Sequence, residues 1–158
     1  MKTIYLAGGC FWGVQHFIDS ANGVKETVVG YANGNTENPS YEQVRYFGTG
    51  HAETCKVVYD ETVLPLRSII KRFLEVIDPF SVNKQGGDEG IQYRSGIYYV
   101  DNDDIPVINA EIEKVENREH RKCAVEVLPL ANFYSAEEYH QKYLEKNPNG
   151  YCHILSKF

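Results

Sequence analysis

The sequence has no long hydrophobic run. No stretch of its 158 residues approaches the ~18 consecutive apolar residues of a membrane-spanning helix. The apolar run of residues 4–7 ends at Gly8, well short of the ~7–15 residues that the core of a signal peptide needs. We therefore predict a cytoplasmic protein that does not bind a membrane.

A concentration of positive charge is also missing. The formal net charge is −6, and the nearest approach to a basic cluster, residues 118–122, is interrupted by Glu119. Proteins that bind nucleic acid carry a basic patch or stripe that neutralises phosphate groups. Nucleic acid is therefore not expected as a partner.

Cysteine is sparse, and no two cysteines form a Cys-x-x-Cys pair. This excludes zinc ribbons and thioredoxin-type redox pairs, and no metal site is predicted. In a cytosolic chain we expect free thiols rather than structural disulfides, with one or two of them used in chemistry. The four cysteines are Cys10, Cys55, Cys123 and Cys152. Cys55 and Cys123 fall in the middle of predicted strands, so both are predicted to be core thiols.

Apolar periodicity predicts strands separated by helices. The clearest helix begins near Pro65, where apolar residues recur at helical spacing as far as Ile77. Strands are predicted over residues 2–7, 24–32, 52–59, 95–100 and 123–128, and the other helices over 11–21, 41–46, 104–115 and 135–145. We predict one α+β domain over residues 1–158, a two-layer mixed sheet with packed helices and a ferredoxin-like core. Its long irregular C-terminal segment, residues 147–158, is predicted to be a flexible tail.

The stretch Gly8-Gly9-Cys10-Phe11-Trp12-Gly13 joins the first predicted strand to the first predicted helix. Backbone N–H groups at a helix N-terminus stabilise a thiolate, so we predict a Cys10 pKa below the usual ~8.5. The flanking glycines are predicted to leave its sulfur uncovered. The alternative is an unreactive core cysteine.

Two further stretches carry polar residues that suit catalysis. Glu53, in His51-Ala52-Glu53, would act as a general acid if burial raised its pKa; a solvated Glu at a strand edge is the alternative. The long loop 81–93 contains three glycines and carries Asp88 and Tyr93. Loops of this length are often functional, so these side chains are predicted to form a polar wall, with a structural role as the alternative.

Cys152 lies in the predicted tail, where a purely structural cysteine has little to pack against. A domain of this length has a radius of gyration of only ~15 Å, so a mobile tail can bring Cys152 to Cys10. His16, His120 and His140 lie on predicted helices without metal-ligand spacing. We predict that these three histidines are surface residues.

Two other functions fit parts of the sequence. A cysteine hydrolase or acyltransferase needs a histidine beside Cys10, and His51 is the candidate near a motif. A peptide-binding module is the non-enzymatic alternative, because 12 Tyr, 7 Phe and 1 Trp exceed what a core of this size needs.

Four stretches together resemble the A-type peptide methionine sulfoxide reductases. They are Gly-Cys-Phe-Trp-Gly at 9–13, Gly-His-Ala-Glu at 50–53, Gln-Tyr-Arg-Ser at 92–95 and Asn-Pro-Asn-Gly-Tyr-Cys at 147–152. The resemblance extends from about residue 4 to residue 152. Gly87 and Ile91 depart from the residues common in that family, Asn and Thr.

The resemblance implies an oxidoreductase that repairs methionine S-sulfoxide, free or in proteins, after oxidative stress. Cys10 would attack the sulfoxide sulfur and become a sulfenic acid. Glu53 would protonate the sulfoxide oxygen, with help from the hydroxyl groups of Tyr41 and Tyr93.

The resemblance also implies how substrate is held and how the enzyme is recycled. Phe11 and Trp12 would form the pocket for the substrate methyl group, and Asp88 would orient the polar side of the site. Cys152 would form a disulfide with Cys10, which a thioredoxin-like protein, or dithiothreitol, would reduce. No metal, flavin or nucleotide cofactor is implied, and a monomer is expected.

Overall fold

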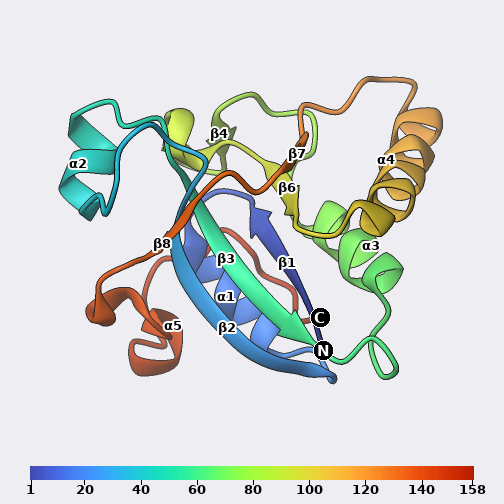
Figure 1. The fold of residues 1–158 in the computed structure, drawn as a ribbon, viewed down its shortest axis with the longest axis horizontal. Helices are drawn as coiled ribbons and strands as arrows, with labels where there is room; N and C mark the ends of the chain where they lie inside the picture. The colour runs from blue at the N-terminus through green and yellow to red at the C-terminus, as the bar shows by residue number, and fades with distance from the viewer.

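A six-stranded mixed sheet forms the centre of the computed structural model, which describes residues 1–158 (Figure 1). Its strands lie in the order β7-β6-β1-β3-β2-β8. They are β1 (Lys2–Ala7), β2 (Val24–Ala32), β3 (Ala52–Tyr59), β6 (Gly96–Tyr99), β7 (Glu126–Pro129) and β8 (Phe133–Ser135). The short strands β4 (Lys84–Gln85) and β5 (Asp88–Glu89) form a separate hairpin.

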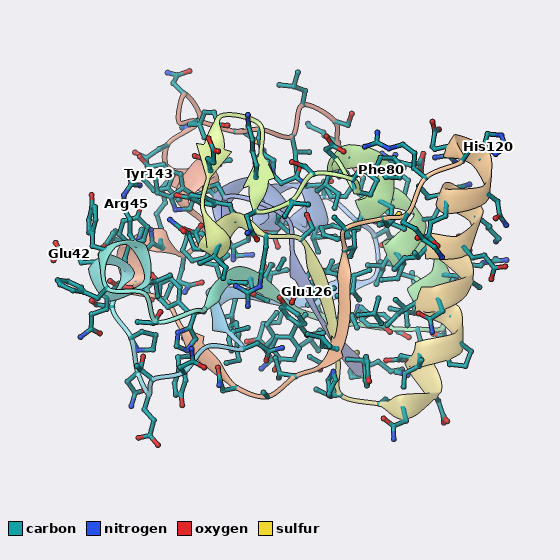
Figure 2. The ribbon with its side chains drawn as sticks, turned by 90° about the horizontal axis from the view of Figure 1, so that it is seen from above. Glu42, Arg45, Phe80, His120, Glu126 and Tyr143 are labelled. Carbon is teal, nitrogen blue, oxygen red and sulfur yellow. The ribbon has the colours of Figure 1, made fainter.

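Five α-helices accompany the sheet. They are α1 (Phe11–Asp19), α2 (Tyr41–Tyr46), α3 (Leu66–Val76), α4 (Ile105–Glu119) and α5 (Tyr143–Lys146), with 3₁₀ turns at Ile91–Tyr93, Asn102–Asp104 and Glu138–His140. Helices α2 and α4 lie at opposite ends of the long axis in both views (Figures 1 and 2).

The four central strands have the topology of a ferredoxin-like core. They lie in the order β6-β1-β3-β2, and every adjacent pair among them is antiparallel. Helix α1 connects β1 to β2, and α3 connects β3 to β6, as in the split β-α-β arrangement. Because β7 pairs parallel with β6, the sheet is mixed. The predicted α+β fold is therefore confirmed.

The main hydrophobic core lies between the sheet and helices α1, α3 and α4. Ile69, Ile70 and Phe73 of α3 are each 0% exposed, whereas charged residues occupy the opposite face of this helix. This is the helix predicted near Pro65, which stands at its N-cap. The 3.6-residue apolar repeat thus places one stripe of α3 against the sheet.

The other face of the sheet is covered by the chain itself. The segment from β7 to β8, orange in Figure 1, crosses in front of the central strands. Leu130 and Phe133 pack there against a small cluster that includes Ala7, Ala32 and Ala52. Because these alanines are small, the backbone of the crossing segment can lie close to the sheet.

The helix predicted over residues 135–145 is wrong. Ser135 ends β8, and the following residues form a 3₁₀ turn and then the one-turn helix α5. The side chain of Gln141 bonds both backbone groups of Val29, accepting at 3.0 Å and donating at 2.9 Å. Glu137 accepts from the hydroxyl of Tyr31 at 2.9 Å. These contacts with β2 hold the segment in an irregular path that a continuous helix does not follow.

Two other predictions concern residues outside regular structure. Cys123 precedes β7 and is only partly buried, so its predicted place within a strand is wrong. No helix or strand follows Lys146, as predicted, although Ile154 is 6% exposed and Phe158 packs against Phe17. The flexibility of residues 147–158 stays a prediction.

Ser40 is expected to stabilise α2, which carries Tyr41. Its hydroxyl accepts from the backbone N–H of Gln43 at 3.2 Å, and its own N–H donates to the Gln43 side chain at 2.9 Å. Removing this capping box in Ser40→Ala should lower the free energy of unfolding by about 1 kcal/mol. Urea denaturation measures this loss. Ser68→Ala, inside α3, is the matched control and should show no loss.

Candidate active site

Cys10 lies at the N-cap of α1, directly after the end of β1. Gly9 before it has φ of +86°, a backbone conformation that glycine adopts without strain. The backbone N–H of Gly13 donates to the Cys10 carbonyl at 3.2 Å and begins the helix. The strand-to-helix turn is therefore as predicted, but Cys10 is only 9% exposed, so the prediction of an uncovered sulfur is wrong.

The predicted low pKa of Cys10 is also wrong for the protein without substrate. Burial raises the pKa of the Cys10 thiol, and the carboxyl groups of Glu53 and Asp88, when ionised, raise it further. The N–H groups of Trp12 and Gly13 act in the opposite direction. The helix N-terminus thus does stabilise the thiolate, but desolvation outweighs it. Cys10 rests as a thiol.

Glu53 is buried beside Cys10, at 2% exposure. The backbone N–H of Phe11 donates to its Oε1 at 3.1 Å, so the carboxyl group lies at the start of α1. Burial raises its pKa from the usual 4.5 to about 8, while the Phe11 N–H and Arg45 act to lower it. Glu53 therefore carries a proton at neutral pH, and the solvated alternative is wrong.

Two tyrosines, Tyr93 and Tyr41, lie on the Glu53 side of the site. Tyr93 is 6% exposed, and burial is the main cause that raises the pKa of its phenol, ahead of the nearby Glu53 and Tyr41. Tyr41 in turn accepts from Nη1 of Arg45 at 3.1 Å. Arg45 lies on α2, as Figure 2 shows. Tyr93 therefore neighbours both Tyr41 and Glu53, and Glu53 is the carboxyl group beside the Cys10 thiol.

Asp88 lies on the short hairpin at the edge of this cluster. Burial raises its pKa, whereas the neighbouring His153, Arg45 and Tyr151 lower it. Its Oδ2 is buried and has no hydrogen-bond partner. Asp88 thus retains an acceptor oxygen that a bound molecule can use.

The aromatic residues of the first motif differ in exposure. The Phe11 ring is 1% exposed and belongs to the main core, packing against Tyr31 with ring centroids 5.7 Å apart. Trp12 is partly buried and stacks on Tyr143 at 3.7 Å. Its Nε1–H donates to Nδ1 of His140 at 3.1 Å. Trp12 therefore offers the accessible apolar surface, with Phe11 beneath it.

The C-terminal segment brings Cys152 to the same end of α1. A Cβ added to Gly13 would lie 3.4 Å from Sγ of Cys152, and the His153 ring bonds the Gly8 carbonyl oxygen at 2.7 Å. The Cys152 thiol donates to the Ile154 carbonyl at 2.9 Å, and both Cys10 and Cys152 are free. The two most distant cysteines in the sequence thus lie at one helix terminus.

A family model described as peptide methionine sulfoxide reductase matches residues 2–158. The chain belongs to this family. It is 56% identical over 153 residues to the peptide methionine sulfoxide reductase MsrA of Lachnoclostridium phytofermentans, covering 97% of this chain and 92% of the relative. MsrA of Clostridium perfringens strain 13 is also 56% identical, over 154 residues and 98% of each chain.

Solved structures of the peptide methionine sulfoxide reductase family share the fold. Reduced Mxr1 from Saccharomyces cerevisiae has a TM-score of 0.92 and 37% identity, over 99% of this chain and 92% of that one. Mxr1 in complex with Trx2 has a TM-score of 0.63 and 27% identity, over 90% and 84% of the two chains.

The other sequence candidates fall outside this reductase-type site. His51 is 0% exposed, and its Nδ1 is paired with the Thr49 hydroxyl at 2.9 Å, with no hydrogen bond to Cys10. The arrangement lacks the Cys–His pair of a hydrolase. Cys55 is 0% exposed on β3, as predicted, and burial raises its pKa. No three His, Cys, Asp or Glu side chains gather where they would bind a metal ion.

Sequence reasoning missed two histidines of the site. His140, predicted at the surface, is 3% exposed and packs among the rings of Phe11, Trp12 and Tyr41. The aromatic residues around it in the sequence were the available signal. His153 follows Cys152, is partly buried, and its ring bonds the Gly8 carbonyl oxygen. Separately, none of the helices has both the length and the apolar character needed to cross a membrane.

Proposed function

We propose that the protein reduces the S epimer of methionine sulfoxide to methionine, using Cys10 as the nucleophile. One observation carries the proposal: a buried, protonated Glu53 lies beside the Cys10 thiol. A sulfoxide oxygen is a poor leaving group until it is protonated. A nucleophile and an acid in one dry site match this requirement.

In the proposed reaction, the Cys10 sulfur attacks the sulfoxide sulfur while Glu53 donates a proton to the sulfoxide oxygen. The hydroxyl groups of Tyr41 and Tyr93 donate hydrogen bonds to the same oxygen. The sulfoxide loses its oxygen to Cys10, which becomes a sulfenic acid; the sulfoxide sulfur is reduced by two electrons and Cys10 is oxidised by two. The high Cys10 pKa fits this step, because the thiol can lose its proton as the substrate oxygen gains one.

The substrate would lie between an apolar and a polar wall. Trp12, supported by Phe11, would contact the methyl group, and the unpartnered Oδ2 of Asp88 would accept a hydrogen bond from the polar side of the substrate. Methionine sulfoxide in proteins, in peptides and free would all be substrates, because the proposed contacts involve the side chain.

Recycling would use Cys152. Its thiol would attack the Cys10 sulfenic acid, forming the Cys10–Cys152 disulfide and releasing water. The position of Cys152 near Gly13 supports this role. A thioredoxin-like protein would then reduce the disulfide, a proposal supported by the relative crystallised in complex with Trx2. We propose a cytoplasmic monomer with no bound cofactor, whose reductant is thioredoxin or, in the assay, dithiothreitol.

Assay with separated sulfoxide epimers tests the function. The protein is incubated with dithiothreitol and a blocked methionine sulfoxide of either the S or the R configuration at sulfur, and methionine is measured by chromatography. We expect methionine from the S epimer alone. Methionine from neither epimer would reject the proposed activity, and equal rates would reject the proposed stereochemistry.

A further inference from the structure

His153 is a partly buried residue of the C-terminal segment, and its ring lies against the Cys10 turn. Its Nε2 bonds the carbonyl oxygen of Gly8 at 2.7 Å. Its Nδ1 is buried and has no hydrogen-bond partner. Buried polar atoms are rarely left unpaired, because each one loses its hydrogen bonds to water. The unpaired Nδ1 of His153 is therefore a candidate for a functional role.

The imidazole ring of His153 lies close to Gly9, which precedes Cys10, and to Gly13, which follows it. A Cβ added to Gly9 would lie 2.9 Å from Nε2 of His153. A Cβ added to Gly13 would lie 2.9 Å from Nδ1 of His153 and 3.4 Å from Sγ of Cys152. Nδ1 and the Cys152 sulfur thus approach one common point. The two glycines leave the space that the ring and the thiol occupy.

The hydrogen bond to Gly8 decides which nitrogen of His153 is basic. A carbonyl oxygen only accepts, so Nε2 carries the hydrogen and Nδ1 has the free lone pair. Burial lowers the pKa of His153, while the Gly8 carbonyl and Asp88 act to raise it, and the ring is neutral. The side chain is a positioned base whose orientation is set by a backbone group.

The resting Cys152 thiol needs such a base. Its hydrogen is held by the carbonyl oxygen of Ile154 at 2.9 Å, and a carbonyl group does not remove a proton. Glu53 is already protonated at neutral pH. Asp88 has an unpaired oxygen, Oδ2, and neighbours Cys10, whereas the three atoms nearest to a Cβ added at Gly13 belong to His153 and Cys152. Of these groups, His153 is the one whose free lone pair and the Cys152 sulfur approach the same point beside Gly13.

We propose that Nδ1 of His153 accepts the thiol proton of Cys152 when this cysteine attacks the Cys10 sulfenic acid. The new S–S bond forms as the S–O bond of Cys10 breaks, and the proton taken by His153 is passed to the departing hydroxide, which leaves as water. Cys152 is oxidised and the sulfenic sulfur is reduced, so no further reactant is needed. This inference rests on the proposed role of Cys152.

The test separates the two chemical steps. Reduced protein is mixed with one equivalent of S-sulfoxide substrate without reductant, and samples are quenched over time. Methionine reports the first step, and the Cys10–Cys152 disulfide, located by mass spectrometry, reports the second. In His153→Gln the amide can still donate to the Gly8 carbonyl but offers no basic nitrogen. We expect disulfide formation to slow at least about tenfold in this variant, with Cys10 sulfenic acid trapped by dimedone.

Two further variants complete the test. In His153→Ala, disulfide formation should also be slow, and added imidazole should restore part of the rate, since a free base can replace the lost one. His120→Asn is the matched control: His120 is exposed at the end of α4, at the opposite end of the molecule from α2, and has φ of 55°, which Asn tolerates (Figure 2). It should form the disulfide at the wild-type rate.

The failures of the two proposals are distinguishable. A wild-type rate of disulfide formation in His153→Gln would overturn the role of His153, as would a slow His153→Ala that imidazole does not accelerate. If instead the unaltered protein makes methionine but no Cys10–Cys152 disulfide, the proposed recycling by Cys152 fails.

Discussion

Replacing Glu53 with Gln is expected to slow methionine formation in a single turnover by about 10²–10⁴-fold. The amide oxygen of Gln can still accept from the Phe11 N–H, as Oε1 of Glu53 does at 3.1 Å, so the turn around Cys10 is kept. The amide has no proton of suitable acidity to give to the sulfoxide oxygen. Rapid quenching with excess enzyme measures this step without recycling.

The pH dependence of the same step tests independently whether Glu53 is the acid. Its pKa is raised to about 8 by burial, so the acid is present below this pH and is lost above it. The wild-type rate should therefore fall by about tenfold per unit as the pH rises beyond 8. Glu53→Gln should lack this decline. If Glu53→Gln forms methionine at a near-normal rate, or if its rate falls above pH 8 as in the wild type, Glu53 is not the acid.

The free energy of unfolding should also depend on pH through Glu53. Because the pKa of Glu53 is about 8 in the folded protein against the usual 4.5, the native state holds this proton more tightly than the unfolded chain. The contribution of Glu53 to the free energy of unfolding is thus greatest below pH 4.5 and declines as the pH rises through 8. Urea titrations at pH 5 and pH 9 should show that the free energy of unfolding falls less between these pH values in Glu53→Gln than in the unaltered protein.

Replacing Cys152 with Ser is expected to abolish sustained turnover with thioredoxin, reducing it at least about 100-fold. One methionine per protein should still appear, because Cys10 performs the first step without Cys152. The reaction then stops at the sulfenic acid, which presents no disulfide for thioredoxin to reduce. The measurement compares steady-state rates with thioredoxin and with dithiothreitol, a small thiol that can reach Cys10 directly and should sustain turnover.

Cys123→Ser is the matched control for this experiment. Cys123 is a partly buried free thiol before β7, and it should be replaceable without loss of turnover with thioredoxin. Continued thioredoxin-supported turnover by Cys152→Ser would show that another thiol resolves the sulfenic acid. Cys55 would be the less accessible substitute, since it is 0% exposed within β3 and would have to move.

Local sequence patterns determined most of the secondary structure. Apolar spacing located α3, because this signal acts between residues within a few positions of each other. The strand-to-helix turn at Cys10 also followed from its neighbours. The motif residues Cys10 and Glu53 could be named for the same reason: residue type and short spacing carry that information.

The segment 135–145 shows where such patterns stop being sufficient. Ser135 and Glu138 have the Ser-x-x-Glu spacing of a capping box, which favours a helix. However, Gln141 bonds Val29, 112 positions earlier in the chain, and Glu137 bonds Tyr31. Hydrogen bonds with β2 form in place of those of a helix, and the local sequence does not predict these long-range bonds. His140 is buried by the same rearrangement, so its predicted surface position failed with the helix.

The protonation of the site was decided by the tertiary structure alone. The helix N-terminus beside Cys10 is visible in the sequence and does favour the thiolate, yet burial of the sulfur outweighs it and raises the pKa of Cys10. Burial raises the pKa of Glu53 to about 8, and two further groups that act on it come from distant segments: the Phe11 N–H, 42 positions away, lowers it and Asp88, 35 positions away, raises it. Sequence determined which groups are present at this site. The folded structure decided how dry the site is, and therefore which groups hold protons.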